Sequence, residues 1–361
     1  MEPLTMDEVT DFEHLYTSML KCRCGVGWKD STLAFCLNGP EQVVKLEREL
    51  KSGTYQPRPP RAFTITNPKR REIVSISFRD RVYQRSLNDN ALYPIMTRSF
   101  IYDNWACQKG KGTLRAKERL YEFLRSYYRK HGTDGWVAQF DIKGYYPNMR
   151  HDAAEACFRK KLPDDVHQAV VNVLRSQYGG EIGYNPGSQM IQIAGISLLD
   201  DMDHYIKEQL HARYYLRYMD DFMIISSDRE YLERCVSEVE RILNSLGFEL
   251  NMKKTRIYPL KDGIMFLGFR FRLTETGRVL KLVDPRNVKA NRKKYARLVA
   301  KCKRGEMQRE DVDKSWQCWM NHLEYGDTYN LRRRLNQYYK SLWRDVDVGN
   351  QNQEKEVPGE R

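Results

Sequence analysis

The segment from Tyr215 to Ile225 restricts the fold of this chain more than any other feature of its sequence. It reads Tyr-Leu-Arg-Tyr-Met-Asp-Asp-Phe-Met-Ile-Ile, so two adjacent acids separate two apolar and aromatic runs. This pattern predicts a β-hairpin with its turn at Met219-Asp220-Asp221. Aspartate is also common in solvated surface turns, but these flanking runs are too apolar for a hairpin at the edge of a sheet. We therefore expect the hairpin to hold two carboxylates at one fixed place.

A third acid, Asp141, has the same kind of setting. It stands near the end of the run from Trp136 to Ile142, which predicts a buried strand. Carboxylates brought together raise one another's pKa values, and Mg²⁺ relieves their repulsion while leaving room for substrate phosphates. Two such ions, about 3.5–4 Å apart, are the usual means of in-line nucleotidyl transfer. The three acids therefore predict a two-metal nucleotidyl-transfer site.

Seven ordered sequence blocks carry a resemblance to a known family. The blocks are Pro68–Ile73, Phe78–Val82, Gly110–Thr113, Phe140–Tyr146, Tyr218–Asp221, Leu246–Phe248 with Lys254-Thr255, and Phe266–Phe269. Together they resemble the reverse transcriptases of bacterial retroelements, from about Leu46 to Leu342. The sequence is most similar to the enzymes of diversity-generating retroelements, and next to the related abortive-infection and antiphage-defence reverse transcriptases.

The resemblance implies an RNA-directed DNA polymerase with two Mg²⁺ ions, for which Mn²⁺ can substitute. The implied metal site consists of Asp141, Ile142, Asp220 and Asp221. Lys254 is implied to protonate the leaving pyrophosphate, although a surface lysine is the alternative interpretation. The implied deoxynucleotide site consists of Lys69, Arg71, Tyr146, Gly187 and Gln192. Tyr146 would exclude a 2′-hydroxyl, and its alternative is a core tyrosine.

The glycine-rich stretch departs from the diversity-generating pattern, which has a glycine followed closely by Ser-Gln. Gly187 and Gln192 stand at matching places, but Ile191 replaces the serine, and Ser188-Gln189 is an alternative pair. This departure weakens the mutagenic-retroelement interpretation and leaves polymerisation unaffected.

The order of predicted elements indicates an α+β fold, namely a right-hand polymerase with fingers, a βαββαβ-type palm and a helical thumb. The predicted domains are an N-terminal helical extension (1–55), fingers (56–135), a palm (136–283) with a finger insertion near 160–188, a helical thumb (284–344) and a disordered tail (345–361). Within the palm we expect a strand (136–142), helices (about 151–176 and 192–210), a hairpin (214–226), a helix (229–246), a strand (255–259) and a strand pair (264–272).

Residues 284–304 predict a basic amphipathic helix, because apolar residues recur at helical spacing among many cations and one acid. A solvated helix face or a membrane-surface helix would have the same composition. After a polymerase palm, a thumb that contacts the duplex backbone is the better interpretation. Its candidate nucleic-acid-binding residues are Arg286, Lys289, Arg292, Lys293 and Arg297.

The net charge of +13 indicates a polyanionic partner, although anionic membranes also attract basic proteins. No apolar run approaches the roughly 18 residues of a membrane span, and the N-terminus lacks the layout of a signal peptide. The eight scattered cysteines suit a reducing cytoplasm, and Cys22, Cys24 and Cys36 lack the paired spacing of a zinc site. We therefore expect a cytoplasmic protein whose partners are an RNA template, a DNA or RNA primer, deoxynucleoside triphosphates, and a dedicated non-coding RNA or accessory protein, with no membrane.

Two rival functions remain open on the sequence. An RNA-directed RNA polymerase would share the palm, but the aromatic residue at position 146 and the finger block argue against it. An RNA-binding scaffold with relic acids is the rival from another class, and the intact acid triad argues against it. The choice between a diversity-generating retroelement and a defence system also stays open.

Overall fold

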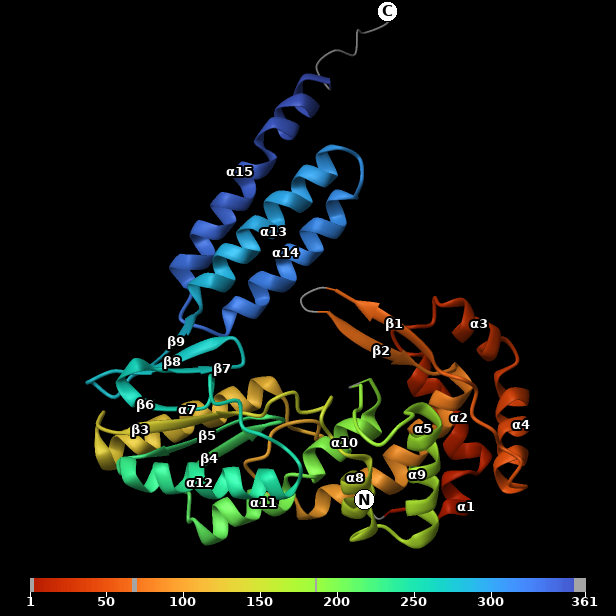
Figure 1. Ribbon diagram of the computed structural model, residues 1–361. Coiled ribbons are helices and arrows are strands. Elements are labelled where there is room, and N and C mark those ends of the chain that lie inside the picture. The colour runs from red at the N-terminus through yellow and green to blue at the C-terminus, as the bar shows by residue number, and fades with distance from the viewer. Residues whose placement is uncertain (1–2, 67–69, 186, 354–361) are drawn as a thin grey trace, which may run out of the picture. The chain divides into compact units, whose positions relative to one another are not determined.

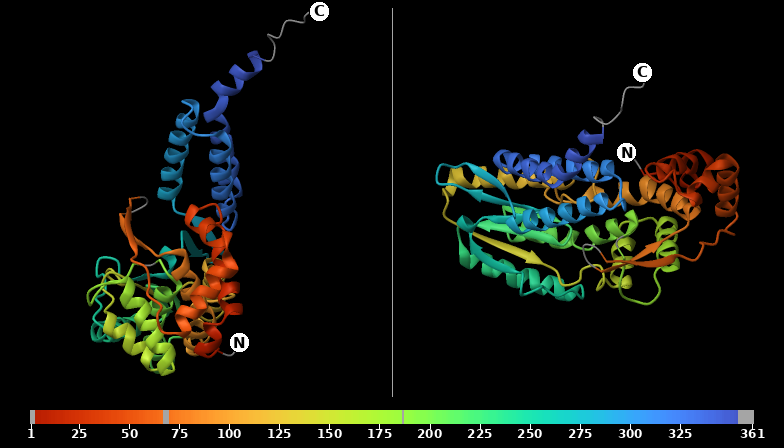
Figure 2. Two further views of the ribbon diagram at one scale, coloured as in Figure 1. Left: turned by 90° about the vertical axis from the view of Figure 1, so that its right-hand side faces the viewer. Right: turned by 90° about the horizontal axis from the view of Figure 1, so that it is seen from above.

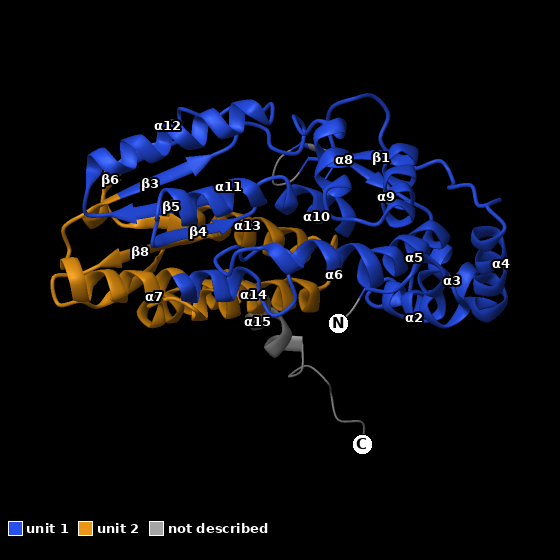
Figure 3. Cartoon of the chain, turned by 90° about the horizontal axis from the view of Figure 1, so that it is seen from below, with its two compact units in different colours: residues 1–119, 137–257 blue, residues 120–136, 258–361 orange. Residues whose placement is uncertain are grey.

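The computed structural model describes residues 3–66, 70–185 and 187–353, and it divides into two compact units (Figure 3). The first unit joins Met1–Arg119 to Val137–Ile257, and the second joins Leu120–Trp136 to Tyr258–Arg361. This division assigns residues 258–283 to the unit that contains the C-terminal helices, whereas the sequence suggested that they belong to the palm. In the described residues no helix is both long and apolar enough to cross a bilayer.

Four helices precede the first strand of the chain. They are α1 (Met6–Val9), α2 (Phe12–Arg23), α3 (Asp30–Leu37) and α4 (Gly39–Lys51). Thr5 and Glu8 form a capping box at the start of α1, and Asp11 caps α2 by accepting from the His14 N–H. Helix α4 packs against α2 and α3, and these helices confirm that the N-terminal extension is helical.

A two-stranded antiparallel hairpin follows. It consists of β1 (Arg61–Ile65) and β2 (Arg71–Ser75), with Ile65 paired to Arg71 and Arg61 paired to Ser75. Figures 1 and 2 show this hairpin projecting away from the N-terminal helices. Of the two proposed triphosphate-binding residues on it, Lys69 lies outside the described residues, and Arg71 is described only by its backbone, as the first residue of β2.

A helical segment connects the hairpin to the central sheet. It comprises α5 (Phe78–Leu87), a π-helical turn (Asn88–Leu92), α6 (Tyr93–Met96), a 3₁₀ turn (Thr97–Ser99) and α7 (Thr113–His131). The boundary between the two compact units falls inside α7. The Ser77 side chain caps α5 by accepting from the Asp80 N–H, which fixes the start of this helix at Phe78.

The central sheet has four strands in the order β4-β5-β3-β6. The strands are β3 (Trp136–Asp141), β4 (Tyr214–Tyr218), β5 (Asp221–Ser226) and β6 (Arg256–Pro259). The predicted hairpin is confirmed, and its turn is tighter than expected, because Tyr218 pairs with Asp221 across a two-residue turn. Helix α12 (Arg229–Ser245) packs on β5 (Figure 1).

Two long helices expected from the sequence are each divided in the structure. The helix expected over 151–176 is α8 (His151–Arg159) and α9 (Asp164–Gln177), separated at Pro163, since a proline disfavours a helical residue before it and has no N–H to donate. The helix expected over 192–210 is α10 (Gln189–Ser197), α11 (Asp200–His204) and a π-helical turn (Tyr205–Gln209). Helix α10 begins early because the Ser188 hydroxyl caps it by accepting from the Ile191 N–H.

Besides the C-terminal part of α7, the second unit contains a three-stranded antiparallel sheet and the three helices that follow it (Figure 1). Its elements are a 3₁₀ turn (Leu260–Asp262), β7 (Ile264–Phe266), β8 (Phe269–Leu273), β9 (Val279–Val283), α13 (Pro285–Lys303), α14 (Arg309–Glu324) and α15 (Tyr329–Gln353). The sequence predicted the β7–β8 pair and missed β9. The helices pack around stacked aromatic side chains, with the rings of Trp316 and Tyr339 4.2 Å apart.

The predicted disordered tail is wrong for its first part. Helix α15 continues to Gln353, whereas the sequence suggested an unstructured segment from residue 345. A polar composition disfavours a buried face, but it does not prevent the extension of a helix that packing has already nucleated. Residues 354–361 lie outside the described part of the chain.

Candidate active site

The sheet brings Asp141 and Asp221 to one face. Phe140 and Phe222, the neighbours of these acids on adjacent strands β3 and β5, stack with ring centroids 4.7 Å apart and planes 10° apart. Because side chains alternate along a strand, the two carboxylates lie on the opposite face from the stacked rings. A core contact between the phenylalanines thus places side by side two acids that are far apart in the sequence.

Asp220 lies in the tight turn between β4 and β5. The preceding residue, Met219, has a φ of 58°, a left-handed conformation that costs energy for a residue with a Cβ. Its carbonyl oxygen accepts a hydrogen bond from Nη1 of Arg217 at 3.1 Å. The turn is therefore anchored from the buried side of the hairpin.

Lys254 and Asn251 hold the carboxylate of Asp141. The Lys254 ammonium lies 2.9 Å and 3.1 Å from the two carboxylate oxygens, and Asn251 Nδ2 donates to Oδ2 at 3.0 Å. The Asn251 N–H also donates to the backbone oxygen of Asp141 at 2.8 Å. The loop after α12 is thus fixed against the end of β3, and it carries Lys254 to the acids, next to which the sequence resemblance had placed it.

Two of the three acids, Asp220 and Asp221, have raised pKa values. Burial raises the pKa of Asp221 to about 7, and the charges of Asp220 and Asp141 add to this effect, while a hydrogen bond from Gln139 opposes it. Burial also raises the pKa of Asp220, and the charge of Asp141 acts in the same direction. This coupling is the repulsion expected when three carboxylates share a small space.

The donor chemistry of these acids fits a hard divalent cation. All three side chains offer oxygen, the ligand that Mg²⁺ prefers. Among the described residues, no three or more Asp, Glu, His or Cys side chains are spaced so that together they could hold a metal ion. A cation at Asp141 would take the place of the Lys254 ammonium. Ile142, the fourth residue proposed for this site, is buried and forms an isolated bridge with Leu250.

Tyr145 and Tyr146 have different environments after the β3 turn. Tyr145 is buried, and its hydroxyl donates to the carbonyl oxygen of Gly195 in α10. Tyr146 packs its ring on the same glycine, where an added Cβ would lie 3.1 Å from the Tyr146 hydroxyl. That hydroxyl is buried and has no hydrogen-bond partner among the described residues. Tyr145 is therefore held within the core, and the role of Tyr146 at the sugar stays a prediction.

Gly187 and Gln192 lie at different places. Gly187 precedes α10 and approaches the backbone of β2, since an added Cβ would meet the Val74 oxygen at 3.5 Å. Gln192 lies within α10, and its Oε1 accepts from the thiol of Cys107, whose sulfur is 3.7 Å from that of Met219. Gln192 therefore approaches the β4–β5 turn, which carries Asp220. The alternative pair has a local role, because Ser188 caps α10 and Gln189 accepts from Asn88 at 3.5 Å.

Sequence reasoning missed two cations behind the acids. Arg217 is completely buried and pairs with Asp203, which is also completely buried. Lys111 donates to the backbone oxygens of Tyr102 and Asn104 at 2.9 Å and 2.6 Å. The only signal for Arg217 was a cation inside an apolar strand, while Lys111 stood in one of the seven sequence blocks without an assigned role.

The five proposed nucleic-acid-binding cations of the second unit are exposed on α13. The opposite side of this helix carries Tyr295 and Val299, which belong to the aromatic core of the three-helix bundle. Arg286 pairs with Asp284 at 2.8 Å, and the Arg292 guanidinium lies 4.3 Å from the centre of the Tyr338 ring. The amphipathic pattern predicted from the sequence is confirmed.

These features coincide with a sequence match to a known family. The profile of the reverse transcriptase (RNA-dependent DNA polymerase) family matches residues 65–271, which span both β3 and the β4–β5 hairpin. The chain therefore belongs to the reverse transcriptase family, whose members are RNA-directed DNA polymerases.

Individual relatives are distant. Protein YkfC of Escherichia coli is 25% identical over 273 residues, which cover 62% of this chain and 70% of YkfC. The group II intron-encoded protein LtrA of Lactococcus lactis is 25% identical over 213 residues, and the match covers 57% of this chain but only 33% of LtrA. A solved structure of apo telomerase from Candida tropicalis covers 63% of this chain and 49% of its own, with 16% identity and a TM-score of 0.45.

Proposed function

We propose that this protein copies an RNA template into DNA by two-metal nucleotidyl transfer. The observation that carries the proposal is the convergence of Asp141, Asp220 and Asp221 at the ends of adjacent strands, where the charge of Asp141 raises the pKa values of both Asp220 and Asp221. Two Mg²⁺ ions bound there would activate the primer hydroxyl and neutralise the leaving pyrophosphate. The protein's own contribution is to hold the carboxylates in place and to keep Lys254 within proton-transfer reach.

We assign the other residues to substrate binding within this proposal. Lys69 and Arg71 would bind the triphosphate, while Gly187 and Gln192 would contact the nascent base pair from the start and interior of α10. Tyr146 would stand under the incoming sugar, and its ring would leave no room for a 2′-hydroxyl. The exposed cations of α13 would contact the backbone of the template–primer duplex, since phosphate contacts supply sequence-independent affinity.

For the biological role, we propose a bacterial or phage retroelement of the diversity-generating type, with an antiphage-defence reverse transcriptase as the alternative. The ordered blocks support both, and Ile191 separates this chain from the common diversity-generating pattern. Neighbouring genes distinguish the roles: a template-repeat and variable-repeat pair supports the first, and a non-coding RNA within a defence island supports the second.

Primer extension on an RNA template tests the activity. Wild-type protein should extend the primer with deoxynucleotides in Mg²⁺ and should use ribonucleotides poorly. The Asp220→Asn/Asp221→Asn variant should lose synthesis to background while it remains folded, because these acids serve the metals. The control variant Asp152→Asn/Asp164→Asn removes two exposed acids, 65% and 91% accessible, and should retain activity. Full synthesis by the first variant would refute the assignment, and efficient use of ribonucleotides by the wild type would favour the RNA-polymerase rival.

A further inference from the structure

Gly195 of α10 contacts both tyrosines of the segment that follows β3. The Tyr145 hydroxyl donates to its backbone oxygen, and the ring of Tyr146 lies on the side where another residue would carry its Cβ. Gly195 is buried within a helix, where glycine is less favourable than every other residue except proline. The helix alone therefore does not account for a glycine at this position, whereas the contact with Tyr146 does.

A side chain at position 195 would crowd the ring of Tyr146. An added Cβ would lie 3.1 Å from the hydroxyl oxygen and 3.3 Å from each of the ring carbons Cε1 and Cζ. Non-bonded carbon atoms attract one another best at about 3.5–4.0 Å, so either the helix or the ring would have to move. Which of the two moves decides whether the residue at position 195 influences the site.

The end of α10 is held by two side chains from other elements. The last carbonyl oxygens of a helix have no partner within it. Here the Gly195 oxygen accepts from Tyr145, and Nη2 of the buried Arg217 donates to the Ile196 oxygen at 3.0 Å. The backbone that would carry the added Cβ is therefore fixed from two directions.

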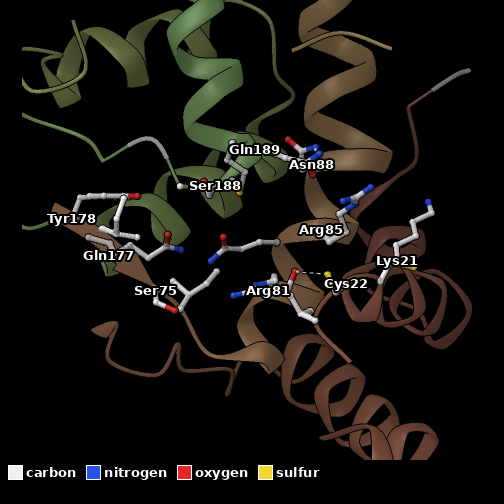
Figure 4. A pocket seen from close by; sticks show the side chains of 18 of the residues that line it. Lys21, Cys22, Ser75, Arg81, Arg85, Asn88, Gln177, Tyr178, Ser188 and Gln189 are labelled. Atoms are coloured by element: carbon white, nitrogen blue, oxygen red, sulfur yellow. Dashed lines mark hydrogen bonds between the residues drawn. The ribbon is translucent and has the colours of Figure 1, made fainter. Parts of the chain in front are cut away.

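The start of α10 is held as well. The Ser188 hydroxyl accepts from the Ile191 N–H at 3.3 Å, and the Gln189 side chain accepts from the Asn88 amide at 3.5 Å. Figure 4 shows Ser188 and Gln189 at this end of the helix, with Asn88 beside Gln189. Since both ends are anchored, the helix cannot easily shift away from Tyr146.

The side chain of Tyr146 can move more easily than the helix. Its backbone oxygen accepts from the N–H groups of Tyr184 at 2.9 Å and Met149 at 3.3 Å, which anchors the main chain. Its hydroxyl, in contrast, has no hydrogen-bond partner among the described residues, and the residue is only half-buried. The Tyr145 ring blocks one side, with the two ring centroids 5.5 Å apart. A methyl group on α10 would therefore displace the Tyr146 ring away from the helix, toward its accessible side.

We propose that Gly195 is a positioning residue for sugar selection. Because it has no side chain, the Tyr146 ring lies back against α10, and the depth of the ring sets the space for the 2′ position of the incoming nucleotide. This inference rests on the proposed function, in which Tyr146 stands under the sugar. A larger residue at position 195 would advance the ring into that space. The glycine thus leaves room for a deoxynucleotide while the ring excludes a 2′-hydroxyl.

Gly195→Ala tests the inference on the incoming nucleotide. The ratio of kcat/KM for deoxynucleotides to kcat/KM for ribonucleotides should rise by roughly tenfold, the lower end of what one methyl group changes in a packed site. For deoxynucleotides the loss should appear in KM more than in kcat, because the three acids keep their places. Nucleotide affinity on a template with a dideoxy-terminated primer, which binds the nucleotide but cannot be extended, gives the same comparison without catalysis.

The Tyr146→Val background is the matched control. Gly195→Ala/Tyr146→Val should have the sugar ratio of Tyr146→Val alone, because the added methyl group then has no ring to displace. The midpoint of thermal unfolding should move in opposite directions. Gly195→Ala should lower it beside the tyrosine and raise it beside the valine, where only the helix preference for alanine acts. A glycine with a purely structural role would change stability and leave the sugar ratio as it is.

Three outcomes would overturn the positioning role. They are an unchanged sugar ratio in folded Gly195→Ala, an equal change in the Tyr146→Val background, and wild-type discrimination in Tyr146→Val itself. If Gly195→Ala is too unstable to assay, Tyr146→Phe and Gly195→Ala/Tyr146→Phe replace the first comparison, since the nearest contact atom, the hydroxyl oxygen, is then absent. The ratio should still rise between these two, by a smaller factor, and an equal ratio would overturn the role. Wild-type protein that extends no primer would instead refute the proposed function.

Discussion

Arg217 pairs with Asp203 in the interior of the first unit and, through the same guanidinium, holds the carbonyl oxygen of Met219 in the catalytic turn. Nε lies 2.7 Å from one carboxylate oxygen of Asp203, and Nη1 lies 3.1 Å from the Met219 oxygen. Nη2 also donates to the Ile196 oxygen at 3.0 Å, and the Tyr215 hydroxyl donates to Asp203 at 2.5 Å. Both charged side chains are fully buried. The position of Asp220 thus depends on an ion pair behind the sheet.

Replacing Arg217 should separate stability from turn geometry. Arg217→Met alone leaves the buried Asp203 carboxylate without its opposite charge, so we expect a loss of about 3–5 kcal/mol in the free energy of unfolding. The triple variant Arg217→Met/Asp203→Leu/Tyr215→Phe should recover most of that stability, because apolar residues can replace a buried ion pair. It should still need more Mg²⁺ for half-maximal primer extension, since nothing anchors Met219.

The measurements are chemical denaturation and magnesium titration of the extension rate. Lys161→Met is the control: it breaks a largely buried pair with Asp200, 2.7 Å apart, that does not contact the turn. This control should lose stability without changing the magnesium requirement. A triple variant with wild-type magnesium dependence would show that Arg217 serves stability alone.

Tyr146 should control the choice of sugar. Tyr146→Val removes the ring that would exclude a 2′-hydroxyl, so it should raise kcat/KM for ribonucleotides and lower kcat/KM for deoxynucleotides by a smaller factor. Tyr145→Phe should lose about 1 kcal/mol of stability, because it removes a buried hydrogen bond to Gly195, and it should leave sugar choice unchanged. The check is kcat/KM for matched ribo- and deoxynucleotides in all three proteins. Unchanged discrimination in Tyr146→Val would remove this residue from the sugar site.

The exposed cations of α13 should set the salt dependence of duplex binding. Neutralising Arg292, Lys293 and Arg297 should flatten the log–log salt slope by about 0.9 for each duplex DNA phosphate that the helix no longer neutralises. Affinity should fall similarly for all sequences, because phosphate contacts do not read bases. The control is Arg309→Ala/Lys314→Ala on α14, which also removes exposed cations from the bundle. If the α13 variant keeps the wild-type slope in an equilibrium titration, this helix face does not contact nucleic acid.

Lys111 should make stability depend on pH in the alkaline range. Burial lowers its pKa to about 8, and Asp103 and Asp203 oppose that shift. Between about pH 8 and 10.4 the unfolded chain therefore binds a proton that the folded protein has released, and the free energy of unfolding rises with pH. Relative to Lys111→Met, the wild type should gain stability over this interval. Denaturant titrations of both proteins at pH 7, 8.5 and 10 measure it, and a constant difference would contradict the lowered pKa.

Local pattern was sufficient to predict the β4–β5 hairpin, because alternation, turn residues and apolar flanks all agreed there. It was equally sufficient for α13, where cations and apolar residues separate at helical spacing. The predicted helix boundaries were wrong where a single residue overrides a long pattern. Pro163 separates α8 from α9, and the Ser188 cap sets the start of α10.

The sequence pattern predicted the acids of the candidate site, and the resemblance added Lys254, which the structure places against Asp141. Carboxylates are oxygen ligands wherever they lie, so the sequence indicated the chemistry of these acids. Only their convergence depended on the sheet. The sequence could not predict the Arg217–Asp203 ion pair, because the pair forms only where strand β4 packs against helix α11. The environment of Lys111 could not be predicted either, because its ammonium donates to backbone oxygens whose positions depend on the fold.

The ion pair between Lys254 and Asp141 gives the site a resident cation of its own. With 60% and 30% of the two side chains accessible, such an ion pair stabilises the fold by at most about 1 kcal/mol. Within the proposed function, a metal ion that binds at Asp141 would exchange with this ammonium, and the released Lys254 would then lie close to the leaving pyrophosphate as a proton donor. In the absence of metal, Lys254 already balances the charge of the Asp141 carboxylate, so this acid can fold without an ion.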